Sequence, residues 1–509
     1  MGGGSFERYR QRLRRMRPNV YMGGQTLGRD DDRLAPGINV IGETYARADD
    51  PAYADVCTAI SHLTEEPINR FCHLHRSVDD LLRKQRMTRL LCHRVGGCIQ
   101  RCMGTDALNA LAVVTAEMDE ALGTGYHARF EDYLRYFQAN DLCANCAQTD
   151  AKGDRLRRPH EQSDPDLYLR IVESRDDGIV VRGAKLHNTI APYADEIIVL
   201  PTRFMTERDG DYAVAFALPA DWEGVKLVVR TAAPFRRLRL EAPAAAMGDA
   251  ESFTIFDDVL VPRDRVFMDG RADPRVIPYA GFLALLFAHY HRHSYTGCKP
   301  AATEILASQS ALVAEYNGIE QAGHVREKLA HLITVAELVY AAGQASAYRA
   351  ERSTAGVYIP DEILTNAGRK LAGEEVYNEF RILADLAGGL AATLPLEGDF
   401  YAPETGELLH KYIMRNPAIP AEHVHRCFRL IETTLVSDLA GVMQVAGLHG
   451  GGSPQMETIT MMHRYDVEAL KGIAKYLAGI EPELPRYERA SVTPRKVLER
   501  YRALFRQEM

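Results

Sequence analysis

The sequence predicts a mainly α protein with a central β domain. Two observations predict this fold class. Near both ends of the chain, apolar residues recur at the three- and four-residue spacing of amphipathic helices. In the middle, short β-branched and aromatic runs are separated by Gly, Pro and Asp, which is typical of strands. Strands and helices do not alternate, and this disfavours a doubly wound nucleotide-binding fold.

The first part of the chain predicts helices. The expected helices are residues 53–63, 78–91 and 98–124. Each carries apolar residues on one face at helical spacing. We therefore expect an N-terminal helical domain over residues 1–139.

The middle of the chain predicts a compact antiparallel sheet or barrel. The strand-like runs are residues 179–185, 196–201, 212–218, 226–230 and 253–261. Before them, the polar segment 150–166 is rich in Lys, Arg and Pro and predicts a long exposed loop, and such loops in compact enzymes are often functional. We expect this middle domain to cover residues 140–275.

The last part of the chain predicts a long helical bundle over residues 276–509. The expected helices are residues 302–316, 319–349, 361–386, 421–446 and 465–478. Their length and spacing match helices packed against one another.

Composition excludes several classes of protein. Hydrophobic residues are 46% and charged residues 26% of the 509, which is ordinary for a globular chain. The net charge of −8 argues against a nucleic-acid partner, and no apolar run approaches the roughly 18 residues of a membrane helix. Nine cysteines, without an apolar leader, predict free thiols and a cytoplasmic location instead of a disulfide framework.

Two segments concentrate cysteine and histidine. Cys98 and Cys102 are four residues apart on a helical pattern, so both thiols are expected on one face. On its own the pair is a weak signal, because a buried cysteine is usually a small hydrophobe. The second segment, residues 289–299, holds three histidines, two tyrosines and Cys298, and is expected at the exposed or site-facing end of a helix.

The spacing of these residues limits their roles. Histidines at alternate positions cannot share one helical face, so His289 or His293 is expected to be structural. Three thiolates and one imidazole could hold an iron–sulfur cluster or a structural zinc ion. The distance along the chain between the two segments favours a cluster held between packed domains.

The remaining cysteines have weaker signals. Cys143 and Cys146 form a C-x-x-C pair with zinc or redox potential, although no second pair lies nearby. Four others have no ligand-like neighbours and are expected to pack in the core: Cys57, Cys72, Cys92 and Cys427.

Motifs along almost the whole chain resemble one known family. They are residues 39–45, 68–71, 74–81, 100–107, 149–155, 181–185, 256–257, 290–299 and 449–455. In these the chain resembles the 4-hydroxybutyryl-CoA dehydratases, within the larger 4-hydroxyphenylacetate 3-hydroxylase family. The three cysteines and the histidine are the discriminating part, because hydroxylase relatives share the scaffold without them.

The resemblance implies a fold, cofactors and an assembly. The fold would be that of acyl-CoA dehydrogenases: an N-terminal helical domain, a middle β-barrel and a C-terminal helical bundle. The cofactors would be FAD and a [4Fe-4S] cluster, and the assembly a homotetramer made of two dimers. The substrate would be an acyl thioester, carried by CoA or a carrier protein.

The resemblance also implies site residues. The cluster ligands would be Cys98, Cys102, His291 and Cys298. The catalytic residues would be His291, Tyr295, Glu251 and Lys299. The flavin would lie near Gln148, Thr149, Asp150, Lys185, Asn188 and Thr189, with Gly450 and Gly451 closing its pocket, where small residues let the backbone approach a cofactor.

The chain departs from the family at Ala446, which stands where the dehydratases carry an active-site glutamate. Alanine cannot transfer a proton. The sequence therefore predicts a radical dehydratase or double-bond isomerase for a 4-hydroxybutyryl-CoA-like thioester, with an altered substrate. Two alternatives are a flavin-dependent aromatic hydroxylase, in which the cysteines only pack, and a non-enzymatic scaffold.

Overall fold

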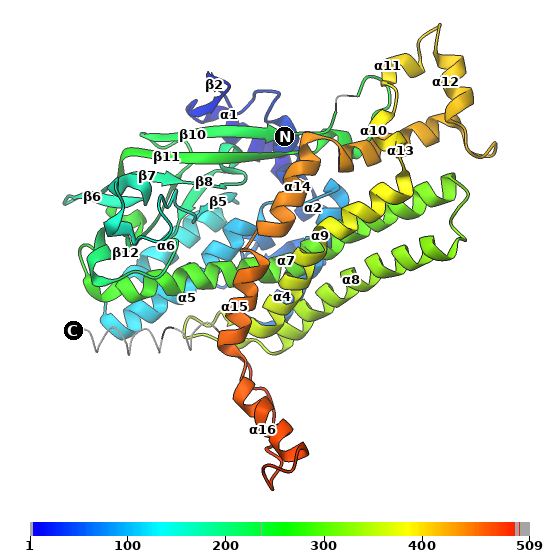
Figure 1. Ribbon diagram of the computed structural model, residues 1–509. Helices are drawn as coiled ribbons and strands as arrows, with labels where there is room; N and C mark the ends of the chain where they lie inside the picture. The colour runs from blue at the N-terminus through cyan, green and yellow to red at the C-terminus, as the bar shows by residue number, and fades with distance from the viewer. Residues whose placement is uncertain (1–3, 236, 494–497, 499–509) are drawn as a thin grey trace.

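The computed structural model describes residues 4–235, 237–493 and 498 (Figure 1). The described part is mostly helical, with a β region beside the helices. The ends of the predicted first and last domains, residues 1–3, 494–497 and 499–509, lie outside the described residues.

Helices dominate the N-terminal part, as predicted. They are α1 (Ser5–Arg15), α2 (Ala35–Ala48), α3 (Ala54–Cys57), α4 (Val78–Val95), α5 (Cys102–Leu122) and α6 (Tyr126–Ala139). Helix α4 begins where the Ser77 hydroxyl accepts a hydrogen bond from the Asp80 amide, and it ends at Gly96, whose φ of 69° is left-handed. Helix α5 is buried on nearly every side.

Two of the expected N-terminal helices differ from the structure. Within residues 53–63 only the short α3 is α-helical, and the chain then forms β3 (Thr58–Ile60), which pairs with β4 (Pro67–Asn69). The Arg70 side chain donates to the carbonyls of Val56 and Thr58, so these carbonyls are not available to continue the helix.

The prediction that Cys98 lies on a helix was also wrong. Helix α5 begins only at Cys102, and Cys98 lies in the connection after Gly96 and Gly97. Gln100 has a φ of 61°, outside the helical range, so the chain cannot be helical from Cys98 onward. The two thiols therefore do not share a helical face.

The strands of the middle region lie in two sheets, where the sequence predicted one compact antiparallel sheet or barrel. One sheet has the order β2-β1-β10-β11-β7-β6 and the other β12-β9-β8-β5. The strands of the first are β1 (Val20–Met22), β2 (Gln25–Leu27), β6 (Arg170–Ser174), β7 (Gly178–Lys185), β10 (Val225–Ala232) and β11 (Asp249–Pro262). Those of the second are β5 (Ala144–Ala147), β8 (Glu196–Val199), β9 (Val214–Pro219) and β12 (Val266–Asp269).

The pairing of these strands is mostly antiparallel. Strands β1 and β10, and strands β5 and β8, pair in parallel. Strand β10 alternates buried and exposed residues, so one face of its sheet is apolar. Phe216 of β9 and Phe256 of β11 meet edge to face, with ring centroids 5.8 Å apart, in the core between the sheets. The two sheets approach each other again at the bridge between Asp150 and Lys185.

A single long helix, α7 (Ile277–Tyr316), runs through the centre of the molecule (Figure 1). It packs against α4, α5, α8 (Gly323–Tyr348) and α9 (Glu362–Ala387). Gly297 permits the close approach of α4, since a Cβ there would lie 2.5 Å from the Gln85 carbonyl oxygen. Residues 289–299 therefore lie inside a buried helix, not at the end of one as predicted, because helices cover α7 on several sides.

The C-terminal part is helical, as predicted. Its other elements are β13 (Glu351–Arg352), β14 (Tyr358–Ile359), α10 (Leu390–Thr393), α11 (Glu397–Phe400), α12 (Gly406–Ile413), α13 (Ala421–Leu435), α14 (Asp438–His449), α15 (Pro454–Arg464) and α16 (Val467–Leu477). The helix expected over residues 421–446 is divided in two, because the Ser437 side chain caps a new helix at the Ala440 amide. None of the described helices is long and apolar enough to cross a bilayer.

Candidate active site

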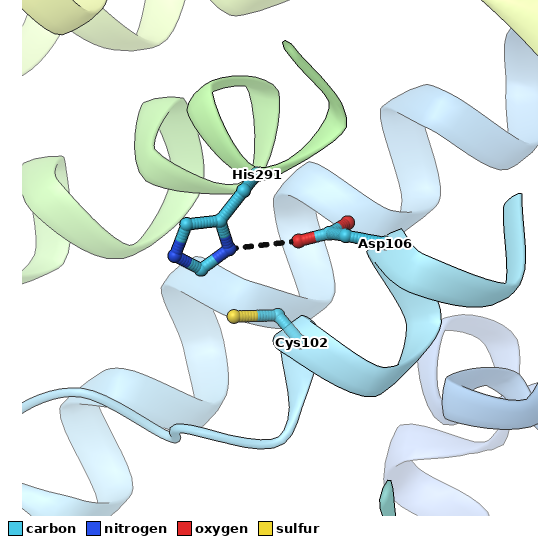
Figure 2. A group of neighbouring side chains, drawn as sticks. All are labelled: Cys102, Asp106 and His291. Carbon is cyan, nitrogen blue, oxygen red and sulfur yellow. Dashed lines mark hydrogen bonds and ion pairs between the residues drawn. The ribbon is translucent and has the colours of Figure 1, made fainter. Parts of the chain in front are cut away.

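The predicted site centres on His291, which projects from the middle of α7 toward α5 (Figure 2). Its Nδ1 lies 2.9 Å from Asp106 Oδ2. One potential ligand atom each from Cys102, Asp106 and His291 lies within 4.8 Å of the other two. These three side chains could therefore share a metal centre, either all as ligands or with one of them orienting another.

The three predicted thiol ligands meet beside this group. Cys98 and Cys298 are hydrogen-bonded to each other through their sulfurs, and this bond lowers the pKa of Cys98 and raises that of Cys298. Burial raises the pKa of Cys102, and the charges of Asp106 and Cys98 raise it further. Cys102 and Cys298 are buried, whereas Cys98 is exposed. The fold thus brings together the four predicted cluster ligands, although Cys98 comes from a loop.

Other aromatic side chains of α7 surround the His291 ring. Phe287, one turn before it, stacks on the ring with centroids 5.7 Å apart, and Tyr295, one turn after it, meets it edge-on at 5.4 Å. The Tyr295 hydroxyl donates to the Ala446 carbonyl oxygen at 2.9 Å. Burial raises the pKa of Tyr295, so the phenol stays protonated near neutral pH.

The glycine turn after α14 closes over Tyr295. A Cβ on Gly450 would lie 1.6 Å from the Tyr295 hydroxyl oxygen, so only glycine fits. Arg369 Nε donates to the Gly450 carbonyl at 2.9 Å, and Arg292 Nε donates to the Gly451 carbonyl at 2.8 Å. These two buried arginines, which sequence reasoning did not single out, fix the turn against α7 and α9.

On the β side, the predicted flavin residues divide into two groups. The first forms a closed network around the buried Lys185 ammonium, which contacts Asp150 Oδ1 at 2.8 Å, the Gln148 carbonyl at 3.0 Å and the Leu200 carbonyl at 2.9 Å. The Thr149 carbonyl accepts from the Leu186 amide at 2.7 Å. Lys185 and Asp150 therefore satisfy each other, and a flavin-binding role for this group remains a prediction.

In the second group, two buried oxygen atoms have no hydrogen-bond partner among the described residues. Thr189 donates to Glu251 Oε1 at 2.7 Å, while Glu251 Oε2 and Asn188 Oδ1 are buried without a hydrogen-bond partner among the described residues. Burial raises the pKa of Glu251, an effect that the Thr189 hydrogen bond opposes. Glu251 also lies close enough to Cys98 to raise the pKa of that thiol. The Glu251 carboxyl therefore lies next to the thiol cluster.

Four basic residues lie between the β side and the glycine turn. Burial lowers the pKa of His187, and the nearby charges of Lys152, Arg155 and His449 lower it further. His449 ends α14, so the glycine turn lies close to the loop at residues 152–155. None of these four basic residues has an acidic partner within ion-pair distance in the described part of the chain. Such a cluster suits a bound anion, such as a phosphate group.

Lys299 is not brought to this cluster by the structure. Its ammonium pairs with the buried Glu379 of α9, and Glu379 also accepts from Thr303 at 2.9 Å. The arrangement gives Lys299 a partner between α7 and α9. A catalytic role for it remains a prediction.

Asp106, Lys84 and Ser294 belong to the site but were missed as site residues. Lys84 of α4 pairs with Asp106 at 2.5 Å, and Ser294 donates to both Asp106 oxygens at 3.0 and 2.9 Å. Burial alone would raise the pKa of Asp106, but Lys84 and His291 outweigh it and the net shift is downward. A signal existed in the sequence, since Asp106 follows Cys102 by one helical turn and shares its face.

The other cysteines behave as predicted packing residues. Cys57, Cys72, Cys92 and Cys427 are all buried. Cys143 lies in the apolar core between the sheets, whereas Cys146 lies in the core beneath α5 and α7. The C-x-x-C pair therefore points into two separate cores.

Likewise the two histidines flanking His291 are buried. His289 Nε2 lies 2.7 Å from the Pro360 carbonyl, and His293 is completely buried. Burial lowers the pKa of His289 to about 4 and that of His293 to about 3, so both are neutral near pH 7. The expectation of a structural histidine at one of these positions is confirmed.

Comparisons with known proteins agree with this geometry. The family models for the N-terminal and C-terminal parts of 4-hydroxyphenylacetate 3-hydroxylase match residues 6–268 and 280–479. The chain is 39% identical to the 4-hydroxybutyryl-CoA dehydratase/vinylacetyl-CoA-Δ-isomerase of Clostridium aminobutyricum, over 93% of this chain and 99% of that protein.

Solved structures give the same relationship. An oxygen-tolerant archaeal 4-hydroxybutyryl-CoA dehydratase from N. maritimus superposes with a TM-score of 0.89 at 35% identity, covering 96% of this chain and 97% of that one. The oxygenase component of 4-hydroxyphenylacetate 3-monooxygenase complexed with FAD superposes with a TM-score of 0.82 at 25% identity, covering 94% and 99%. The chain is therefore an enzyme of the 4-hydroxyphenylacetate 3-hydroxylase family, similar over nearly its whole length to 4-hydroxybutyryl-CoA dehydratases.

Proposed function

We propose that the chain is an FAD- and [4Fe-4S]-dependent dehydratase or double-bond isomerase for a 4-hydroxybutyryl-CoA-like acyl thioester. The observation that carries the proposal is the convergence of Cys98, Cys102, Cys298 and His291, which come from a loop and two helices. Similarity to two dehydratases of the same family supports it.

The donor set suits the proposed cluster. Iron–sulfur clusters are held by thiolates, and histidine can replace one of them. Buried thiols with raised pKa values need a cation to become thiolates, and a bound metal supplies that charge. Zinc could also use such ligands, but zinc has no redox chemistry to offer this family's reaction.

The β side suits a flavin. The orphaned Asn188 Oδ1 and Glu251 Oε2 could accept hydrogen bonds from a flavin ring or from a substrate. The basic side chains of Lys152 and Arg155, which have no acidic partner in the described part of the chain, could hold its phosphates. FAD lies in a structure similar to this chain, and we propose the same cofactor here.

The substrate explains why side chains alone would not suffice. In a 4-hydroxyacyl thioester the carbonyl activates the α-proton but not the β-proton, and an unactivated C–H is beyond an ordinary side-chain base near neutral pH. When bound, the flavin would take one electron from the substrate and the iron would act as a Lewis acid toward the departing hydroxyl.

The chain's own residues would then hold and move protons. His291 presents Nε2, either as a ligand or as a proton acceptor. Tyr295 keeps its proton and stands one helical turn away as a donor. The Glu251 carboxyl has a raised pKa, which suits a proton carrier beside Cys98. The glycine turn packs against the Tyr295 hydroxyl.

The substrate is proposed to differ from that of the named dehydratases. Ala446 offers only its backbone carbonyl, which accepts from Tyr295. A carboxylate is therefore absent at the position that the family resemblance assigns to glutamate. We propose an acyl thioester whose conversion needs one fewer carboxylate.

We also propose several finer properties of the molecule. They are a homotetramer built from two dimers, an acyl-CoA dehydrogenase-like fold, and the domain boundaries 1–139, 140–275 and 276–509. A reducing cytoplasmic location fits the nine free thiols, all of which lie in the described part of the chain.

A substrate panel tests the proposal. Anaerobically purified protein is assayed with 4-hydroxybutyryl-CoA and vinylacetyl-CoA, alongside the Ala446→Glu variant. We expect weak or no dehydration by the natural chain and a gain of at least about 100-fold from the new carboxylate, the lower end of general acid–base effects. Hydroxylation of a phenol that depends on reduced flavin and O₂ would instead support the aromatic hydroxylase alternative.

A further inference from the structure

The His291 ring is held in one orientation by a contact of its Nδ1 with Asp106. Its Nδ1 lies 2.9 Å from Asp106 Oδ2 (Figure 2). A carboxylate can only accept, so Nδ1 carries the hydrogen and Nε2 keeps its lone pair. In Figure 2, the ring nitrogen without a dashed line lies on the side of the ring that faces away from Asp106.

Asp106 itself cannot move, because both of its oxygens are occupied. Oδ1 pairs with Lys84 Nζ at 2.5 Å, and Ser294 Oγ reaches Oδ1 at 3.0 Å and Oδ2 at 2.9 Å. Lys84 is tied in turn to the Tyr290 carbonyl at 3.3 Å. Asp106 is completely buried, and its charge is matched by Lys84. An oxygen that leaves these partners would leave a buried ammonium unpaired.

We infer that Asp106 is a positioning residue and not a metal ligand: clamped by Lys84 and Ser294, it holds His291 Nδ1 and leaves Nε2 as the ring nitrogen that is free to bind a metal. This inference deepens the proposed function, on which its metal-binding part rests. Carboxylates that orient a metal-bound histidine through its second nitrogen have effects of about 10- to 100-fold on metal affinity.

The packing of the ring makes this hydrogen bond decisive. Phe287 lies parallel to the ring and Tyr295 meets it edge-on, so both contacts survive a half-turn of the ring about its bond to Cβ. Apolar packing therefore does not select which edge of the ring faces Asp106. The carboxylate provides that selection, because a half-turn would leave its oxygen facing a C–H group.

The first experiment needs no cofactor. Crystal structures are determined of cluster-free natural protein and of the Asp106→Ala and Asp106→Asn variants. We expect the His291 ring to turn or to occupy two orientations in Asp106→Ala. Asp106→Asn keeps only one acceptor oxygen for the two donors Lys84 Nζ and His291 Nδ1–H, so we expect a smaller change of the ring than in Asp106→Ala. An unchanged single orientation in Asp106→Ala would overturn the inference.

The second experiment measures the metal. Iron and sulfide are determined after anaerobic purification, and nitrogen hyperfine coupling is measured by pulsed EPR after reduction. Asp106→Ala should lose iron at least about 10-fold and lose the histidine nitrogen coupling, whereas Asp106→Asn should lose less iron than Asp106→Ala. Asp361→Asn is the matched control, because it alters another buried acid, the partner of Arg489 at the start of α9, and should keep its iron.

The two experiments separate the possible failures. Natural protein without iron and sulfide would contradict the proposed function, and the ring orientation in cluster-free crystals would still decide the role of Asp106. A metal bound directly to an Asp106 oxygen would contradict the inference while leaving a metalloenzyme. Iron retained in Asp106→Ala to the same level as in Asp361→Asn would also contradict it.

Discussion

The two sides of the site treat buried polar groups in opposite ways. On the thiol side, formed by Cys98, Cys102, Cys298 and His291, three sulfurs gather, and His291 Nε2 has no hydrogen-bond partner among the described residues. On the scaffold side, formed by Gln148, Asp150, Lys185 and Leu200, every polar atom of the Lys185–Asp150 pair finds a partner.

This difference distinguishes side chains that are free to bind a ligand from side chains whose hydrogen bonds are satisfied within the fold. Burying a polar group without a partner is costly, so a fold that leaves several of them together has a ligand to place there. A closed network has no valence left for a ligand. The thiol side and the scaffold side both carry recognisable motifs in the sequence. Of these two groups, only the thiol side has atoms that are free to bind a ligand. Changes to the two sides should therefore have different consequences.

The largest effect is expected from removing a thiol ligand. Cys102→Ser should lower activity by about 10³-fold or more and abolish the iron content, because one cluster ligand is lost. The unfolding free energy of the cluster-free protein should change little, since serine is close in size. Activity, iron analysis and denaturant unfolding of the cluster-free protein are the measurements. Cys92→Ser, at a packing cysteine, is the control and should keep its iron.

On the scaffold side the expected loss is stability. Lys185→Met leaves the Asp150 carboxylate buried and unpaired, which should lower the unfolding free energy by about 3–5 kcal/mol. The matched control is Arg182→Met on the same strand, where the pair with Asp258 is exposed and should contribute little to stability. Equal losses in the two variants, measured by urea unfolding, would remove the distinction between the two sides.

The glycine turn joins the two sides and should respond in between. Gly450→Ala places a methyl group against the Tyr295 hydroxyl and should cost about 1–3 kcal/mol as the turn shifts. Activity should fall while iron content is retained, because the thiols are untouched. Gly441→Ala, within α14, is the control, because a Cβ there meets no atom within 4 Å and its φ is not left-handed. Loss of iron from Gly450→Ala would show that the turn supports the cluster itself.

The smallest expected effect is a pH dependence within the β region. Burial raises the pKa of Glu196 to about 7, although Arg265 lies 2.9 Å away and opposes the shift. Between pH 4.5 and 7 the folded protein therefore holds more protons here than the unfolded chain. The stability from this group is complete below pH 4.5 and is lost as the pH rises through 7. Glu196→Gln should flatten that decline in thermal unfolding between pH 5 and 8. An unchanged slope would contradict the shift.

Much of the fold followed from the sequence, and the misses have physical causes. Apolar periodicity predicted α4, α8 and α9 closely, because nothing in those segments competes with the helix. It failed at residues 53–63, where the distant Arg70 takes the helix carbonyls. It failed at Cys98, where two glycines end α4 and the chain turns before α5 begins.

The sequence predicted site residues of distinctive types, such as cysteine and histidine. It did not predict residues whose role depends on their position in the folded chain. Cys102, Cys298 and His291 are conspicuous in the sequence and meet in the structure. Lys185 and Asp150 carried an equally clear motif, but their mutual pairing depends on strand pairing that composition does not reveal. Lys84 looked like an ordinary helix residue, since only the packing of α4 against α5 and α7 buries it.

The central claim is that the four gathered side chains hold a redox-active cluster beside a flavin. Its most direct test is the iron, acid-labile sulfide and FAD content of natural protein purified without oxygen. We expect the natural protein to contain iron and sulfide in equal amounts, together with FAD. We expect Cys102→Ser to lose the iron and the sulfide. A protein that binds FAD but contains neither iron nor sulfide would contradict it.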